Sequence, residues 1–291
     1  MSTDAVRRHL LEGEREGARF AFVATHRPPF GLAGLRLGAR SGSSLEFQDH
    51  REYQPGDDLR FVDWGAYARS DKLVVKRYHE EVFPHVDLVL DGSRSMDLEG
   101  GEKGRAAVAL SALVAAAAAN ADLTVTCWLA VDGCEKVIGG GLAPSAWEGI
   151  RLTGSRSPAA AFAAAPPALK PQGIRVFVSD LLFEDDPEPI LALLSRNAAA
   201  VVVVQLLGAA DADPGERGSV RLVDVESGAI SEVRVDDASL RRYRDALKTH
   251  EESWTRAARR AGAALVTLVA EDVVKGWALE ELVAAGLLQP V

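Results

Sequence analysis

Three oxygen-bearing side chains lie within five residues of one another, at a position where they could hold a metal ion. Asp91 supplies a carboxylate, and Ser93 and Ser95 supply hydroxyl groups. They follow residues 86–90, a short apolar run that predicts a strand buried on both faces. At the carboxyl end of such a strand in an open parallel sheet, ligands bind. Oxygen ligands suit a hard cation such as Mg²⁺, although Asp91 and Ser93 could instead only cap the next helix.

A second carboxylate, Asp180, follows another predicted strand at residues 173–178. Predicted strands alternate with predicted helices along the chain, two of the helices being expected at residues 146–152 and 274–285. This alternation indicates an α/β fold with a doubly wound, mostly parallel sheet. In such a sheet Asp91 and Asp180 lie at the same edge.

Composition excludes several classes of protein. The chain has 291 residues, 47% of them hydrophobic, and a formal net charge of -9, which argues against non-specific binding to nucleic acid. No apolar run is long enough to insert into a membrane, and the first sixteen residues lack the apolar segment of a signal peptide. Two cysteines and scattered histidines make a zinc site or disulfide framework unexpected. We therefore expect a cytoplasmic protein.

The stretch from residue 45 to residue 81 is dense in arginine and aspartate and has two interpretations. One is a nuclease, in which Asp63 and either Glu80 or Glu81 hold a metal near Lys76. The favoured interpretation is a structural network, because guanidinium groups pair bidentately with carboxylates. The expected members of this network are Arg51, Arg60 and Arg69, with Asp57, Asp58 or Asp63 as partners.

The sequence DGSRS at residues 91–95 resembles the D-x-S-x-S motif of von Willebrand factor A domains. In that fold the metal-ion-dependent adhesion site also takes a threonine from a second loop and an aspartate from a third. Asp180 matches the aspartate, and Ser157 fits the threonine position best, with Thr153 as the alternative. The resemblance therefore implies one Mg²⁺ site formed by Asp91, Ser93, Ser95, Ser157 and Asp180.

Residues 51–64, REYQPGDDLRFVDW, and residues 73–76, LVVK, resemble the signature of a bacterial family, the domain-of-unknown-function family numbered fifty-eight. Its members carry a von Willebrand A-like half, and their genes usually lie beside those of MoxR-type AAA+ ATPases. The resemblance implies two parts. Residues 1–84 would form an N-terminal, β-containing family segment packed on the main domain, and residues 85–291 the A-like α/β domain.

Two classes of function follow. The favoured one is an interaction module, an accessory or adaptor of a MoxR-type ATPase. It would bind an acidic residue of the ATPase, or of its client protein, through the metal and without chemistry. The alternative is a metal-dependent hydrolase, either a phosphatase using Asp91 or a nuclease using the arginine and aspartate stretch. The sequence shows no paired general acid and base, activated nucleophile or phosphate loop, and haloacid-dehalogenase phosphatases have an aspartate where this chain has Ser93.

Overall fold

The computed structural model describes residues 1–23, 47–55, 57, 59–78, 85–98, 102–215, 217–225 and 228–291. The chain divides into two compact units. One contains Met1–Gly31 and Pro84–Val291, and the other Leu32–Phe83. The N-terminal helix therefore belongs to the same unit as the main sheet, although the sequence analysis assigned it to the N-terminal family segment.

A six-stranded sheet, in the order β11-β8-β7-β4-β5-β6, is the centre of the larger unit. All neighbouring strands run parallel except β5 and β6, which form an antiparallel pair. The strands are β4 (His85–Asp91), β5 (Thr124–Ala130), β6 (Cys134–Lys136), β7 (Ile174–Ser179), β8 (Ala200–Leu207) and β11 (Ala264–Val269). The prediction of an α/β fold with a mostly parallel sheet is confirmed.

The strand order changes direction at β4. From β4 the chain continues to β5 on one side, and it returns to β7 and β8 on the other side. In open α/β sheets the carboxyl ends of the strands at such a switch point form a crevice that binds ligands. The polar turn after β4 and the carboxylate after β7 lie at this point.

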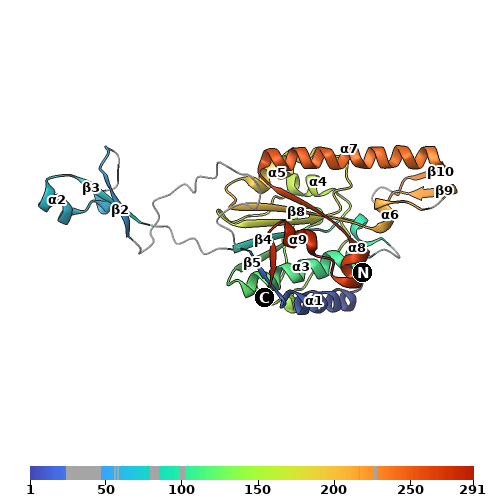
Figure 1. Cartoon of the computed structure of the whole chain (residues 1–291), viewed down its shortest axis with the longest axis horizontal. Coiled ribbons are helices and arrows are strands. Elements are labelled where there is room, and N and C mark those ends of the chain that lie inside the picture. The colour runs from blue at the N-terminus through green and yellow to red at the C-terminus, as the bar shows by residue number, and fades with distance from the viewer. Residues whose placement is uncertain are drawn as a thin grey trace. The chain divides into compact units, whose positions relative to one another are not determined.

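Helices cover both faces of the sheet (Figure 1). One face carries α4 (Pro158–Ala164), α5 (Pro187–Ser195) and α7 (Asp237–Ala261), whose buried side chains form one apolar cluster. The other face carries α1 (Thr3–Gly17), α3 (Lys103–Asn120), α8 (Ala270–Gly276) and α9 (Glu280–Ala284). Helix α3 is apolar nearly all round because it lies between the sheet and α1.

Two sequence predictions in this unit are wrong. Residues 146–152 are not a helix: the short 3-10 turn η3 (Pro144–Ala146) ends at Ala146, and Glu148 forms an isolated antiparallel bridge with Ile138. The helix predicted at residues 274–285 is divided into α8 and α9, since Trp277 adopts a left-handed conformation with φ 53° that ends α8. Lys275 followed by Gly276 is a local signal of a helix end that the prediction of one continuous helix did not take into account.

The remaining elements of the larger unit are short. Helix α6 (Ala209–Ala212) follows β8, and strands β9 (Gly218–Val223) and β10 (Ile230–Val235) form an antiparallel pair. Strand β1 (Phe20–Phe22) pairs antiparallel with β12 (Leu288–Pro290). In the part of the chain that the structure describes, no helix has the length and apolarity that crossing a membrane requires.

The smaller unit contains an antiparallel pair, β2 (Phe47–Glu52) and β3 (Val74–Tyr78), with the 3-10 turn η1 (Leu59–Phe61) and the short helix α2 (Trp64–Ser70) between them.

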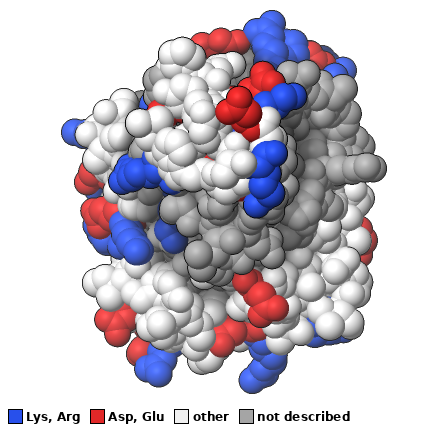
Figure 2. All heavy atoms as spheres, turned by 90° about the vertical axis from the view of Figure 1, so that its left-hand side faces the viewer, with Lys and Arg blue, Asp and Glu red and all other residues white. Residues whose placement is uncertain are grey.

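On the face that Figure 2 shows, acidic and basic side chains of the described residues are interspersed.

Candidate metal-binding edge

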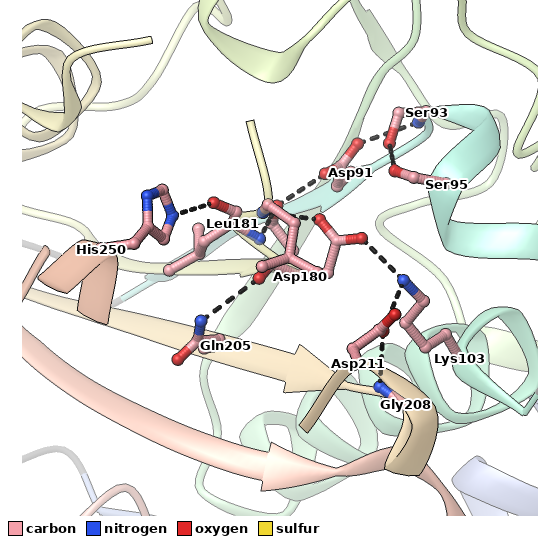
Figure 3. Close-up of polar contacts among 12 residues, drawn as sticks. Asp91, Ser93, Ser95, Lys103, Asp180, Leu181, Gln205, Gly208, Asp211 and His250 are labelled. Atoms are coloured by element: carbon pink, nitrogen blue, oxygen red, sulfur yellow. Dashed lines mark hydrogen bonds and ion pairs between the residues drawn. The ribbon is translucent and has the colours of Figure 1, made fainter. Parts of the chain in front are cut away.

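Four of the five predicted residues, Asp91, Ser93, Ser95 and Asp180, meet at the carboxyl ends of β4 and β7 (Figure 3). Asp91 is the last residue of β4, and Asp180 directly follows β7. Both are buried, with 0% and 1% of their surface exposed. Each carboxylate is therefore removed from water at the switch point of the sheet, where its charge must be compensated locally.

Asp91 is held by two hydrogen bonds. Its Oδ1 accepts the backbone N–H of Ser93 at 2.9 Å, and its Oδ2 accepts the hydroxyl of Ser179 at 2.6 Å. Burial, and then the negative charge of Asp180, raise the pKa of Asp91 to about 7 despite these bonds. A cation placed beside Asp91 would favour its ionised form and lower this pKa.

The hydroxyls of Ser93 and Ser95 lie 2.9 Å apart, next to Asp91 (Figure 3). Ser93 precedes the 3-10 turn η2 (Arg94–Asp97), but its side chain makes no capping hydrogen bond there. The alternative in which Asp91 and Ser93 only cap the next helix is therefore wrong for Ser93, whereas Asp91 does accept the N–H of Ser93, the residue before η2. The loop is instead held by its backbone, because Ser93 forms a bridge with Gly154 and the Arg94 N–H donates to the carbonyl of Gly154 at 3.0 Å.

Asp180 has a basic partner that the sequence analysis missed. Its Oδ2 lies 2.9 Å from Nζ of Lys103, the first residue of α3, and its Oδ1 accepts the N–H of Leu182 at 3.0 Å. The same Nζ lies 2.9 Å from Oδ2 of Asp211 in α6. Burial alone would lower the pKa of Lys103, but the two carboxylates outweigh it and raise this pKa. Lys103 is therefore a charged ammonium inside the site.

The backbone after Asp180 is in an unusual conformation. Leu181 is fully buried and has φ 59°, in the left-handed region that a bulky side chain rarely adopts. Its N–H donates to the Ser179 hydroxyl at 3.0 Å, and its carbonyl accepts Nε2 of His250 at 2.7 Å. These bonds hold a strained turn that fixes where the Asp180 carboxylate lies.

Ser157 is engaged elsewhere. Its hydroxyl donates to Asp185 and accepts the N–H of Ala160, so that it caps α4. Thr153, the alternative, has an exposed side chain, and its carbonyl accepts Nε of Arg94 at 3.3 Å. The structure thus brings together Asp91, Ser93, Ser95 and Asp180, and it places the loop with Thr153 beside them through the Ser93–Gly154 bridge.

The residues that meet here fit a hard divalent cation by their chemistry. Two carboxylates and two hydroxyls are oxygen donors of the kind that Mg²⁺ takes, with water completing its coordination. Within the described residues, no three or more His, Cys, Asp or Glu side chains are placed so that they could hold a metal ion together, so the ligand set of a zinc site is not found there, and a cation at this edge would depend on hydroxyls and water as well as on the carboxylates. Lys103 is the feature that opposes a cation, because it already neutralises Asp180.

The nuclease interpretation of the smaller unit has less support. Asp63 accepts the N–H of Ala66 at the start of α2 and lies 2.8 Å from Nε2 of His50, so its carboxylate is used structurally. The pairing predicted for Arg51 is confirmed, since its guanidinium donates to both carboxylate oxygens of Asp57 at 2.7 and 2.6 Å. Two more positions of that interpretation, Glu80 and Glu81, lie outside the described residues, as do Asp58 and the side chain of Lys76.

Similar proteins have been found among curated sequences and solved structures. An uncharacterized protein of Mycobacterium bovis, Mb1516, and one of Mycobacterium tuberculosis, Rv1480, are each 27% identical over 250 residues, covering 81% of this chain and 78% of each relative. An aerotolerance-related membrane protein from Bacteroides fragilis matches at 15% identity with a TM-score of 0.37, covering 68% of this chain and 98% of that one. BatB from Bacteroides thetaiotaomicron matches at 12% identity with a TM-score of 0.35, covering 69% of this chain and 98% of that one.

A family model covers most of the chain. The model described as "Protein of unknown function DUF58" matches residues 49–253, which include the arginine and aspartate stretch of the smaller unit and the whole edge formed by β4 and β7. The chain therefore belongs to the DUF58 family of proteins of unknown function.

Proposed function

We propose that this protein is a metal-dependent interaction module with a von Willebrand factor A-like fold. Asp91, Ser93, Ser95 and Asp180 would hold Mg²⁺ at the carboxyl edge of the sheet, with a hydroxyl from the loop of Thr153 and Ser157 as a further ligand. The single observation that carries the proposal is the meeting of the buried Asp91 carboxylate with two hydroxyls at the switch point of the sheet.

The residues around Asp91 prepare this edge for a cation. The Ser179 hydroxyl and the Ser93 N–H orient the carboxylate, and burial beside the negative charge of Asp180 raises the pKa of Asp91. A Mg²⁺ bound there would supply a coordination position that an acidic side chain of another protein can take from water.

The proposed partner is a MoxR-type AAA+ ATPase or its client protein, and the proposed location is the cytoplasm. The partner rests on the family resemblance of residues 51–76 and on the acidic group that such a site would bind. A chain with a net charge of -9 does not attract an acidic partner at long range, so recognition would depend on the local ion.

A metal-dependent hydrolase is the weaker alternative. A phosphatase of the D-x-D type needs a second carboxylate where this chain has Ser93, whose hydroxyl contacts Ser95. Asp63, the central residue of a nuclease, already caps α2 and contacts His50.

Binding of Mg²⁺ is expected to raise the melting temperature of the full chain. An ion that binds only the folded state adds about 2.7 kcal/mol of stability at a hundredfold excess over its Kd. Thermal melts in EDTA and in millimolar MgCl2 measure this effect, and Asp91→Asn should abolish it, since the variant removes the charge while it keeps the shape of the side chain. Asp245→Asn, on the exposed side of α7, is the matched control and should respond as the wild type does. A wild-type melt that Mg²⁺ leaves unmoved would contradict the proposed site.

Binding to a MoxR-type ATPase is expected to require both the metal and Asp91. Calorimetry with the purified ATPase should show an interaction that EDTA removes and that Asp91→Asn removes in the presence of Mg²⁺. Hydrolysis of a phosphate ester or of DNA by the wild type, lost in Asp91→Asn, would instead favour the hydrolase. An interaction that survives both treatments places the interface away from this edge.

Ser179→Ala is expected to weaken Mg²⁺ binding about tenfold or more, because partners that orient a ligand typically contribute 10- to 100-fold. The variant removes the donor to Asp91 Oδ2 and the acceptor of the Leu181 N–H. Calorimetric titration with MgCl2 measures the affinity. Ser195→Ala is the matched serine control, because the buried hydroxyl of Ser195 has no hydrogen-bond partner among the described residues. Equal affinity in the wild type and Ser179→Ala would show that Ser179 does not orient the ligand.

A further inference from the structure

Lys103 is a lysine with 5% of its surface exposed, placed between two carboxylates of the site. Its Nζ lies 2.9 Å from both Asp180 Oδ2 and Asp211 Oδ2 (Figure 3). A buried ammonium costs several kcal/mol of desolvation unless it is paired, so these two contacts keep it in place. Lys103 is the first residue of α3, and it contacts Asp180 although the two residues are 77 positions apart in the sequence.

The charges at this edge are unevenly matched. Three carboxylates belong to the cluster that Figure 3 shows, those of Asp91, Asp180 and Asp211, and Lys103 pairs with the last two. A Mg²⁺ held by Asp91 and Asp180 would place two further positive charges close to the ammonium. Since like charges a few ångströms apart repel strongly in a buried site, Lys103 and the metal cannot both use Asp180 without cost.

Asp211 offers Lys103 a second position. Asp211 lies on α6, where its Oδ2 also accepts the N–H of Gly208 at 3.0 Å, and its side chain is more exposed than that of Asp180. Its backbone carbonyl accepts the hydroxyl of Tyr243 on α7. The Lys103 ammonium can therefore stay paired with the Asp211 carboxylate when Asp180 binds a metal ion.

We propose that Lys103 is a tethered cation that competes with the divalent ion for Asp180. It holds Asp180 when no metal is bound, and it pairs with Asp211 alone when the metal takes Asp180. This inference rests on the proposed metal site and adds a residue that sets its affinity. Lys103 compensates the charge of Asp180 when no metal is bound, and it makes metal binding weaker.

The test is a calorimetric titration of the full chain with MgCl2, for the wild type and three variants. Lys103→Met keeps the length of the side chain and removes the competing charge, so it should bind Mg²⁺ at least about tenfold more tightly than the wild type. Asp211→Asn removes the second position of Lys103 and should weaken binding about three- to tenfold. In the double variant the effect of Asp211→Asn should disappear, because Asp211 acts only through Lys103. Lys248→Met, exposed on α7, is the control and should bind as the wild type does.

The outcomes separate this inference from the proposed function. If the wild type and Lys103→Met bind Mg²⁺ equally well, the metal site stands and the competition by Lys103 is refuted. If neither binds, both proposals fall. If Lys103→Met binds Mg²⁺ and the wild type does not, the inference is supported, but the proposed metal-dependent function of the wild type is contradicted. Should Lys103→Met not fold, Asp211→Asn decides: weaker binding supports the competition, and unchanged binding overturns it.

Discussion

Replacing Arg175 by methionine is expected to lower the free energy of unfolding by about 3–5 kcal/mol, the usual cost of removing one partner of a buried charge network. Arg175 lies on β7 with 2% of its surface exposed. Its Nη1 donates to the carbonyls of Leu193 and Leu194, and its Nη2 to that of Lys170. The guanidinium thus satisfies carbonyl groups in the last turn of α5 that have no partner within the helix.

The charge of Arg175 matters as well as its hydrogen bonds. Burial lowers the pKa of Arg175, whereas the negative charge of Asp87, itself fully buried, raises it. Methionine fills a similar volume but leaves the α5 carbonyls unpaired and removes the positive charge near Asp87. Both losses destabilise the folded state, while removal of the guanidinium relieves part of its desolvation cost, which is the reason that the pKa of Arg175 is lowered overall.

Urea unfolding followed by far-ultraviolet circular dichroism measures the Arg175→Met effect. Arg196→Met is the matched control, because Arg196 is exposed and directly follows α5. Its free energy of unfolding should differ from that of the wild type by no more than about 0.5 kcal/mol. Equal midpoints for Arg175→Met and Arg196→Met would show that the buried guanidinium does not stabilise the helix–sheet contact.

Gly13→Ala is expected to lower the free energy of unfolding by about 3 kcal/mol, at the upper end of the range for overpacking. A Cβ atom at Gly13 would lie 1.9 Å from the carbonyl oxygen of Ala109 and 2.9 Å from Cβ of Ala112. Both belong to α3, so α1 would have to move away from the helix that it covers. Helix propensity alone predicts the opposite sign, a gain of about 1 kcal/mol for alanine over glycine.

The sign of the change makes this a sharp experiment. Gly276→Ala is the matched control, because Gly276 is also helical and a Cβ there would meet nothing within 4 Å. It should leave the melting temperature unchanged or raise it slightly. A Gly13→Ala variant that melts as high as Gly276→Ala would mean that α1 does not pack closely on α3.

The local sequence was sufficient to predict the edge of the sheet on which the site lies. Residues 86–90 and 173–178 are apolar runs ended by polar residues, and strands linked by helices run parallel. Two carboxylates that follow such strands must reach the same edge, so Asp91 and Asp180 could be paired without coordinates. Pairing of Arg51 with Asp57 was predictable for a similar reason, since the two residues flank one short turn.

The rest of the site depends on contacts between distant segments. Lys103 reaches Asp180 across 77 positions, and the hydroxyl of Ser179 points to Asp91 because β7 lies beside β4. Sequence patterns report the period of one element, whereas strand order and helix packing decide which elements become neighbours. The same limit applies to Ser157, whose hydroxyl contacts Asp185 through the packing of two loops. The sequence alone thus determined the two carboxylates and their edge. Only the tertiary structure decided that a lysine shares one of them, because that choice depends on how α3 packs against the sheet.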